Sequence, residues 1–62
     1  MAPRFLSIAD VAEQLSISAQ AVRSLIRTGE LPAIQVGARG LWRIEVAALE
    51  DYIDKQYAHT RE

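Results

Sequence analysis

The chain has 62 residues, a length that supports one small domain with a single core and excludes a large active-site cleft. Of these residues, 50% are hydrophobic and 24% are charged, which is the balance of a globular domain and not of a disordered segment. The formal net charge is −1 and cysteine is absent, so the chain lacks the overall basic excess usual for nucleic-acid partners and has no disulfides, thiolate nucleophiles or cysteine-based zinc sites.

The first predicted element is a helix over residues 8–15. Ser7 is a favourable N-cap residue, and Asp10 three positions later completes a capping box. The apolar residues that follow recur at the spacing of one helical face, and that face is predicted to be buried. Its members are Ile8, Val11, Ala12 and Leu15.

A second helix is predicted over residues 19–28, after a short turn at residues 16–18. Ser18 is the expected N-cap, because its hydroxyl can accept a hydrogen bond from a first-turn amide. Gly29 favours the left-handed conformation in which helices often end, and Pro32 prevents the helix from resuming.

The second helix has two distinct faces. An apolar stripe suited to packing comprises Val22, Leu25 and Ile26. A polar stripe on another face comprises Gln20, Arg23, Ser24 and Arg27. Glutamine and arginine pair with adenine and guanine edges in the major groove of DNA, whereas the alternative interpretation of an isolated polar stripe is a solvated surface.

A β-hairpin is predicted next, with strands at residues 34–36 and 42–44 joined by Gly37-Ala38-Arg39-Gly40. Arg39 at the tip and Arg43 on the return strand are candidates for phosphate contacts. As alternatives, the glycines serve only the turn and Arg43 covers Trp42 with its aliphatic stem. Trp42 is assigned to the core in preference to stacking on a base.

The last predicted element is a helix over residues 45–57. Asp51 and Lys55 are spaced to form an i, i+4 ion pair on its surface. The residues predicted to point inward are Val46, Leu49, Ile53 and Tyr57. The acidic surface of this helix faces either solvent or the basic surface of another protein or copy.

Charge is distributed unevenly along the chain. Residues 1–43 hold five arginines and three acidic residues, whereas residues 44–62 hold two basic and five acidic residues. The net charge of −1 therefore conceals a polarised molecule whose N-terminal part is basic.

Two short helices joined by a tight turn are the order of a helix-turn-helix, in which the second helix enters the major groove. The sequence resembles the excisionase-type helix-turn-helix proteins related to the MerR DNA-binding domain. The resemblance is carried by residues 5–12, Leu15, Ser18, Val22, residues 25–33, Val36, Gly37, Arg39, residues 42–44, Leu49, Tyr52 and Ile53.

This resemblance implies an α+β, mainly helical fold, a winged helix-turn-helix with a two-stranded hairpin wing and a C-terminal helix. Members of that family act as bacterial or phage excisionases, recombination directionality factors or small transcription regulators. The DNA contacts that the resemblance implies lie at the helix positions Ser18, Gln20, Arg23, Ser24 and Arg27 and at the wing positions Arg39 and Arg43. Helix 19–28 is then expected in the major groove and wing 37–43 on the backbone.

Other classes of function are not favoured. The sequence has no phosphate-binding glycine motif and no paired catalytic groups, and its single histidine, His59, lies near the C-terminus. We therefore expect no enzyme, metal, cofactor or small-molecule substrate. The short apolar runs predict a cytoplasmic protein without a membrane partner, organised as one domain over residues 1–62 with an ordered core at about 5–57.

The expected partner is double-stranded DNA. Further copies of the chain on tandem sites, or a recombinase or regulatory protein, are additional candidates. The competing hypothesis is a protein-interaction module that uses the helix 45–57 and never touches DNA.

Overall fold

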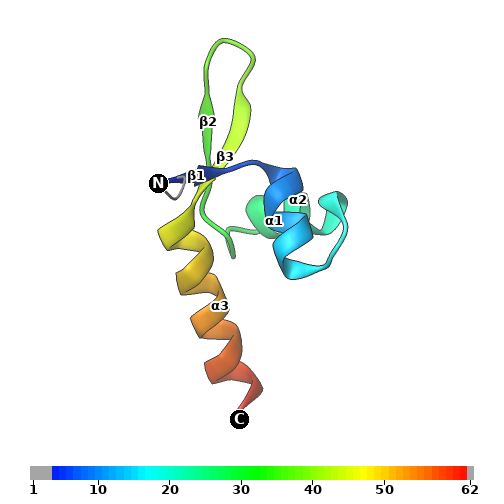
Figure 1. The fold of residues 1–62 in the computed structure, drawn as a ribbon, viewed down its shortest axis with the longest axis vertical. Helices are drawn as coiled ribbons and strands as arrows, with labels where there is room; N and C mark the ends of the chain where they lie inside the picture. Colours follow the sequence, from blue (N-terminus) through cyan, green and yellow to red (C-terminus); the bar gives the residue numbers. More distant parts are fainter. Residues whose placement is uncertain (1–3, 62) are drawn as a thin grey trace.

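The computed structural model describes residues 4–61. Residues 1–3 and 62, which the predicted domain 1–62 includes, lie outside this part. The elements follow in the order β1 (Phe5–Leu6), α1 (Ile8–Leu15), α2 (Ala19–Arg27), β2 (Ile34–Val36), β3 (Leu41–Glu45) and α3 (Val46–Thr60). The β2–β3 hairpin and α3 extend in opposite directions, and α1 and α2 lie to one side of them (Figure 1). The molecule measures 42 × 28 × 18 Å.

Helix α1 begins in the predicted capping box. The Ser7 hydroxyl accepts from the Asp10 amide at 3.0 Å, and the Asp10 carboxylate accepts from the Ser7 amide at 3.0 Å. Ser16 ends the helix in the left-handed region at φ 55°, a conformation that few residues other than glycine adopt. The chain can therefore reverse within the three residues 16–18.

Helix α2 begins at the predicted N-cap, where the Ser18 hydroxyl accepts from the Ala21 amide at 3.0 Å. It ends at Arg27, one residue before the predicted end, and Thr28 is the C-cap. Gly29 follows with φ 83° and donates its amide to the Ile26 carbonyl at 3.1 Å. The expected role of this glycine in stopping the helix is confirmed.

The sheet has three strands in the order β1-β3-β2, and both pairings are antiparallel. The hairpin β2–β3 was predicted, whereas β1 was not. In β1, Phe5 pairs with Glu45 and Leu6 with Ile44. The Val46 amide also donates to the Arg4 carbonyl at 2.8 Å. These bonds attach the N-terminal segment to the point where β3 continues into α3.

One apolar core joins all the longer elements. Val11 and Val22 are fully buried and connect α1 to α2, while Ile44 is fully buried beneath them in β3. The complete buried set is Leu6, Val11, Ala12, Val22, Leu31, Ile44 and Leu49. Burial of such aliphatic side chains stabilises a fold by about 1.5–3 kcal/mol each, so this small set is the main support for the positions of α2 and the hairpin.

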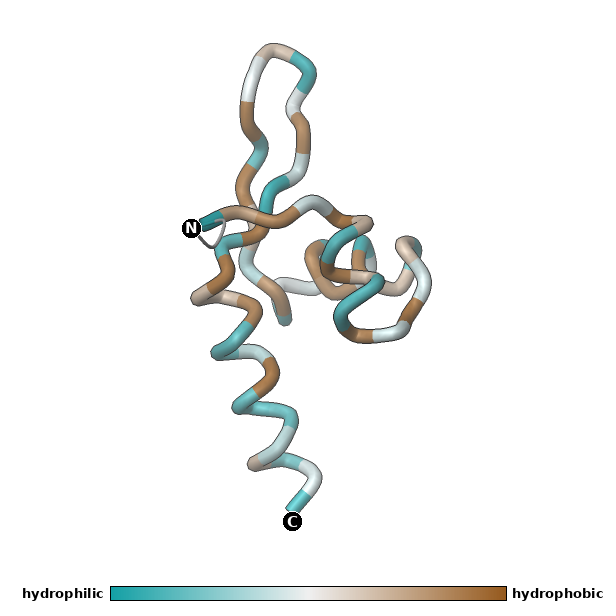
Figure 2. The backbone as a smooth tube through the Cα atoms, viewed as in Figure 1, coloured by the Kyte–Doolittle hydropathy of each residue, from teal (hydrophilic) through white to brown (hydrophobic). Residues whose placement is uncertain are grey.

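Helix α3 packs against β3 and extends beyond the core. Leu49 is buried, and Val46 and Ile53 are half-buried as predicted. The predicted inward position of Tyr57 is wrong: this side chain is 65% exposed, because the helix continues past the end of the core. Hydrophobic residues concentrate toward the start of α3, and hydrophilic residues dominate toward its end (Figure 2).

Two further features of α3 bear on the predictions. Lys55 and Asp51 form the expected i, i+4 ion pair at 3.1 Å. The helix begins at Val46, with Glu45 as its N-cap, and ends at Thr60, three residues beyond the predicted end at Tyr57. Within residues 4–61, no helix is both long and apolar enough to cross a bilayer.

Candidate nucleic-acid interface

The polar stripe of α2 lies on the surface opposite the buried Val22. Gln20, Arg23 and Arg27 are exposed, and Ser24 is half-buried. Arg27 donates from Nη2 to the Ser24 hydroxyl at 3.2 Å, which orients its guanidinium along the helix. Helix α2 contains two arginines and no acidic residue, so the stripe presents donors to a negatively charged partner.

Ser18, also a predicted contact residue, lies at the N-terminal end of this stripe. Its oxygen already accepts the hydrogen bond from the Ala21 amide that caps α2. The hydroxyl proton remains able to donate, as a hydroxyl can donate and accept at once. The N-cap and a contact to an acceptor on a partner are therefore compatible uses of this side chain.

The turn of the wing depends on its two glycines. Gly37 and Gly40 have φ values of 79° and 63°, and the Gly40 amide donates to the Gly37 carbonyl at 3.1 Å. A Cβ at position 40 would lie 3.2 Å from Nε2 of Gln35, which itself donates to the Gly40 carbonyl at 3.3 Å. The positive φ favours glycine here, and a larger residue would also have to displace the Gln35 side chain by a few tenths of an ångström.

Arg39 is exposed within this turn. The turn lies at the end of the hairpin that is farthest from the helices (Figure 1). Arg39 is therefore separated from the arginines of α2, and the predicted contact residues form two parts: a group around α2 and the base of the wing, and one arginine at the wing tip.

A hollow between α2 and the wing brings part of the predicted set together. It has a volume of about 440 Å³ and is lined by Arg23, Ile26, Arg27 and Trp42. A second hollow of about 280 Å³ lies between the first turn of α1 and the start of β3, and Arg23, Trp42 and Arg43 are among its lining residues. Three of the four predicted arginines therefore line adjoining hollows.

Arg43 is half-buried and donates from Nη1 to the carbonyl of Trp42 at 2.7 Å. Part of its hydrogen-bonding capacity is thus used within the protein, although a guanidinium has five N–H donors. The hydrogen bond from the Ser7 amide, then the one from the Ser7 hydroxyl, lowers the pKa of the Asp10 carboxyl, and the positive charge of Arg43 lowers it further by a smaller amount.

Trp42 was assigned to the core, and the structure corrects this assignment. The indole is only half-buried and lines both hollows beside the arginines. Alternation along β3 places Trp42 on the same side as the buried Ile44, but two residues nearer the wing tip. The residue therefore lies where the core ends.

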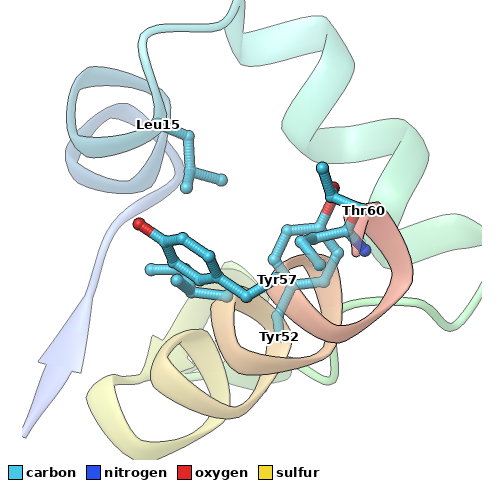
Figure 3. A pocket seen from close by; sticks show the side chains of 6 residues that line it. Leu15, Tyr52, Tyr57 and Thr60 are labelled. Carbon is cyan, nitrogen blue, oxygen red and sulfur yellow. The ribbon is translucent and has the colours of Figure 1, made fainter. Parts of the chain in front are cut away.

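A different groove lies between the end of α1 and the last turns of α3. It has a volume of about 290 Å³ and is lined by Leu15, Tyr52, Ile53, Gln56, Tyr57 and Thr60. Leu15 and the two tyrosines surround it (Figure 3). Its lining contains no basic residue, so it lacks the means to attract a polyanion.

Metal-binding chemistry is not evident in the part of the chain that the structure covers. Over residues 4–61, no three side chains of His, Cys, Asp or Glu converge in a way that could hold a metal ion.

Comparison with known proteins adds independent findings. A family model described as "Helix-turn-helix domain" matches residues 5–57, a range that runs from β1 into α3. Two curated relatives from two strains of Mycobacterium tuberculosis each carry the name "Putative DNA-binding protein". Each is 33% identical over 54 residues, which cover 87% of this chain and 67% of the relative.

Proposed function

Because this chain belongs to the helix-turn-helix domain family, we propose that it binds double-stranded DNA with sequence preference and without catalysing a reaction. Its role is that of a small transcription regulator or of an excisionase acting as a recombination directionality factor. The observation that carries the proposal is the exposed face of α2, which presents two arginines and a glutamine beside the base of a glycine-turned hairpin.

In this proposal α2, with Thr28 at its end, lies in the major groove. Gln20 and the α2 arginines face base edges and the adjacent phosphates. The wing, residues 37–43, follows the backbone with Arg39 at its tip. Arg43, at the base of the wing, donates to the Trp42 carbonyl and offers its remaining donors to a phosphate.

The small size of the module has a consequence for affinity. A single module of this kind buries only about 600–1,000 Å² on DNA. Strong binding then requires more contact area, which further copies on tandem sites, or a recombinase or regulatory protein, would supply. Selection of bound duplexes from a random pool would reveal both the preferred motif and any regular spacing between copies.

Binding to duplex DNA across a range of salt concentrations tests the proposal. Four arginines on phosphates predict a log–log slope of about −3 to −4, because each neutralised phosphate releases counterions. The variant Arg23→Ala/Arg27→Ala is expected to lose about 10- to 100-fold in affinity and to reduce the slope to about −2. A salt-independent profile would contradict the proposal.

The matched control is Lys55→Ala/Arg61→Ala, which removes the same positive charge from exposed positions at the far end of α3. Its DNA affinity is expected to stay close to that of the wild type, since α3 extends away from the wing (Figure 1) and salt screens charges over a Debye length of about 10 Å. Equal losses of DNA affinity in both variants would mean that the affinity depends only on the net charge of the protein.

The apolar groove of Figure 3 favours one alternative, a protein-interaction module that uses α3. The same pair of variants separates the two functions. If the chain retains DNA binding after loss of both α2 arginines, α2 is not the contact helix. If it never binds duplexes, the groove beside α3 becomes the leading candidate site.

A further inference from the structure

The hollow between α2 and the wing is lined by both basic and apolar residues. Its lining combines two exposed basic residues, Arg23 and Arg27, with two half-buried apolar residues, Ile26 and Trp42. None of these four lining residues is acidic. The hollow therefore combines cationic hydrogen-bond donors with apolar side chains. This combination suits a ligand with an apolar body and anionic groups on either side.

The hollow also continues toward α1. A second hollow lies between the first turn of α1 and the start of β3, and Arg23 and Trp42 line both. The two hollows, which share Arg23 and Trp42, are together called the passage. A chain-like ligand that occupied both hollows would contact the Trp42 indole, which lines each of them.

The geometry of DNA identifies that ligand. The major and minor grooves of a duplex alternate, and a single sugar–phosphate strand separates one from the next. If α2 lies in the major groove and the wing follows the same strand from its other side, the strand passes between the two elements. Deoxyribose supplies the apolar body and the neighbouring phosphates supply the anionic groups.

We propose that this passage seats the sugar–phosphate backbone of one DNA strand, with the Trp42 indole against a deoxyribose and the guanidinium groups of Arg23 and Arg27 on flanking phosphates. This inference rests on the proposed function. It adds Trp42 to the contact residues and assigns the α2 arginines a part in holding the backbone, which leaves Gln20 as the α2 side chain facing base edges.

The chain offers a direct probe, because Trp42 is its single tryptophan. Quenching of tryptophan fluorescence by acrylamide therefore reports the accessibility of Trp42 alone, at the residue that both hollows share. Acrylamide is uncharged, so the DNA does not repel it as it would repel iodide. The measurement uses the intact chain with and without a saturating duplex of random sequence at low salt, and binding is followed separately by anisotropy of the same duplex labelled with fluorescein.

The expected result is a rise in anisotropy together with a severalfold fall in quenching by acrylamide. If the anisotropy rises while Trp42 stays equally accessible, the passage is overturned but DNA binding stands. If the anisotropy does not rise at all, the proposed function fails and the passage fails with it. The two failures are thus distinguishable.

A substitution provides the second measurement. Trp42→Leu removes the aromatic surface without changing charge, so DNA affinity is expected to fall about tenfold with an unchanged salt slope, since the number of neutralised phosphates is the same. Tyr57→Leu, an aromatic replacement on the exposed end of α3, is the matched control and is expected to bind as the wild type does. Wild-type affinity in Trp42→Leu would overturn the passage, and if that variant does not fold, the quenching experiment on the wild type decides.

Discussion

The helix pair α1–α2 and the helix α3 share one core but are stabilised differently. Each helix of the pair has only eight or nine residues, and each begins at a serine whose hydroxyl accepts a first-turn amide. Helix α3 has 15 residues and begins at Glu45 with no side-chain cap. Short helices are marginal by themselves, so the pair depends on its caps, whereas α3 depends on the burial of its first half.

The same two regions also differ in charge. Helix α2 carries two arginines and no acid, whereas α3 carries three acidic residues, Glu50, Asp51 and Asp54, and a single lysine. The acidic helix extends away from the wing (Figure 1). A net charge near zero is therefore compatible with a polyanion-binding face, provided that the opposite charges are kept at a distance.

The largest effect is expected at the anchor of α3. Leu49 is 2% exposed, and Leu49→Ala should lower the free energy of unfolding by about 2–5 kcal/mol, because the lost methylene groups leave a cavity. Urea denaturation followed by circular dichroism would measure this. The net free energy of unfolding of a domain this small is about 3–5 kcal/mol, after the conformational entropy of the chain has offset most of the burial, so extensive unfolding of the variant is expected.

Tyr57→Ala on the same helix gives the contrast. Its side chain is 65% exposed, and its replacement should change the free energy of unfolding by at most about 0.5 kcal/mol. A loss comparable to that in Leu49→Ala would show that the end of α3 belongs to the cooperative core, and the proposed difference between its two halves would be wrong.

A smaller effect is expected at the helix caps. Ser18→Ala removes the bond to the Ala21 amide and should cost about 1 kcal/mol of stability. Glu45→Ala removes no cap from α3 and only breaks an exposed ion pair with Arg4 at 3.3 Å, which is worth about 0–1 kcal/mol. Thermal melts of the two variants would therefore show Ser18→Ala to be the less stable. The reverse order would contradict a special dependence of α1 and α2 on their caps.

The sequence predicted what local patterns determine. The period of Val11, Leu15, Val22 and Ile26 identified both helices of the pair, and the caps at Ser7 and Ser18 marked where they begin. The strand β1 was missed because its two residues form a strand only by pairing with Ile44 and Glu45, about 40 positions later. Pairing between distant segments leaves no periodic signal in so short a strand.

The position of Tyr57 and the surroundings of Trp42 were missed for a related reason. Each residue continues a correct apolar pattern, but that pattern gives only the direction of a side chain. Whether another element lies there depends on how far the core extends. The same limit applies to the candidate site, where the period placed Arg23 and Arg27 on one face of α2 but could not show that the wing tip holds Arg39 away from them.

The smallest effect is expected at the acid end of the pH range, where α1 and α3 should differ. Hydrogen bonds from the Ser7 amide and hydroxyl lower the pKa of the exposed Asp10 carboxyl below its ordinary value of 3.8, so the ionised form is favoured by folding. Its stabilising effect is fully present above pH 3.8 and is lost as the pH falls below that value through the lowered pKa. Asp10→Asn removes this titration, and denaturation at a series of acidic pH values should show its stability deficit shrinking as the pH falls. A deficit that stays constant down to the most acidic pH would mean that the charge of Asp10 does not support the cap of α1.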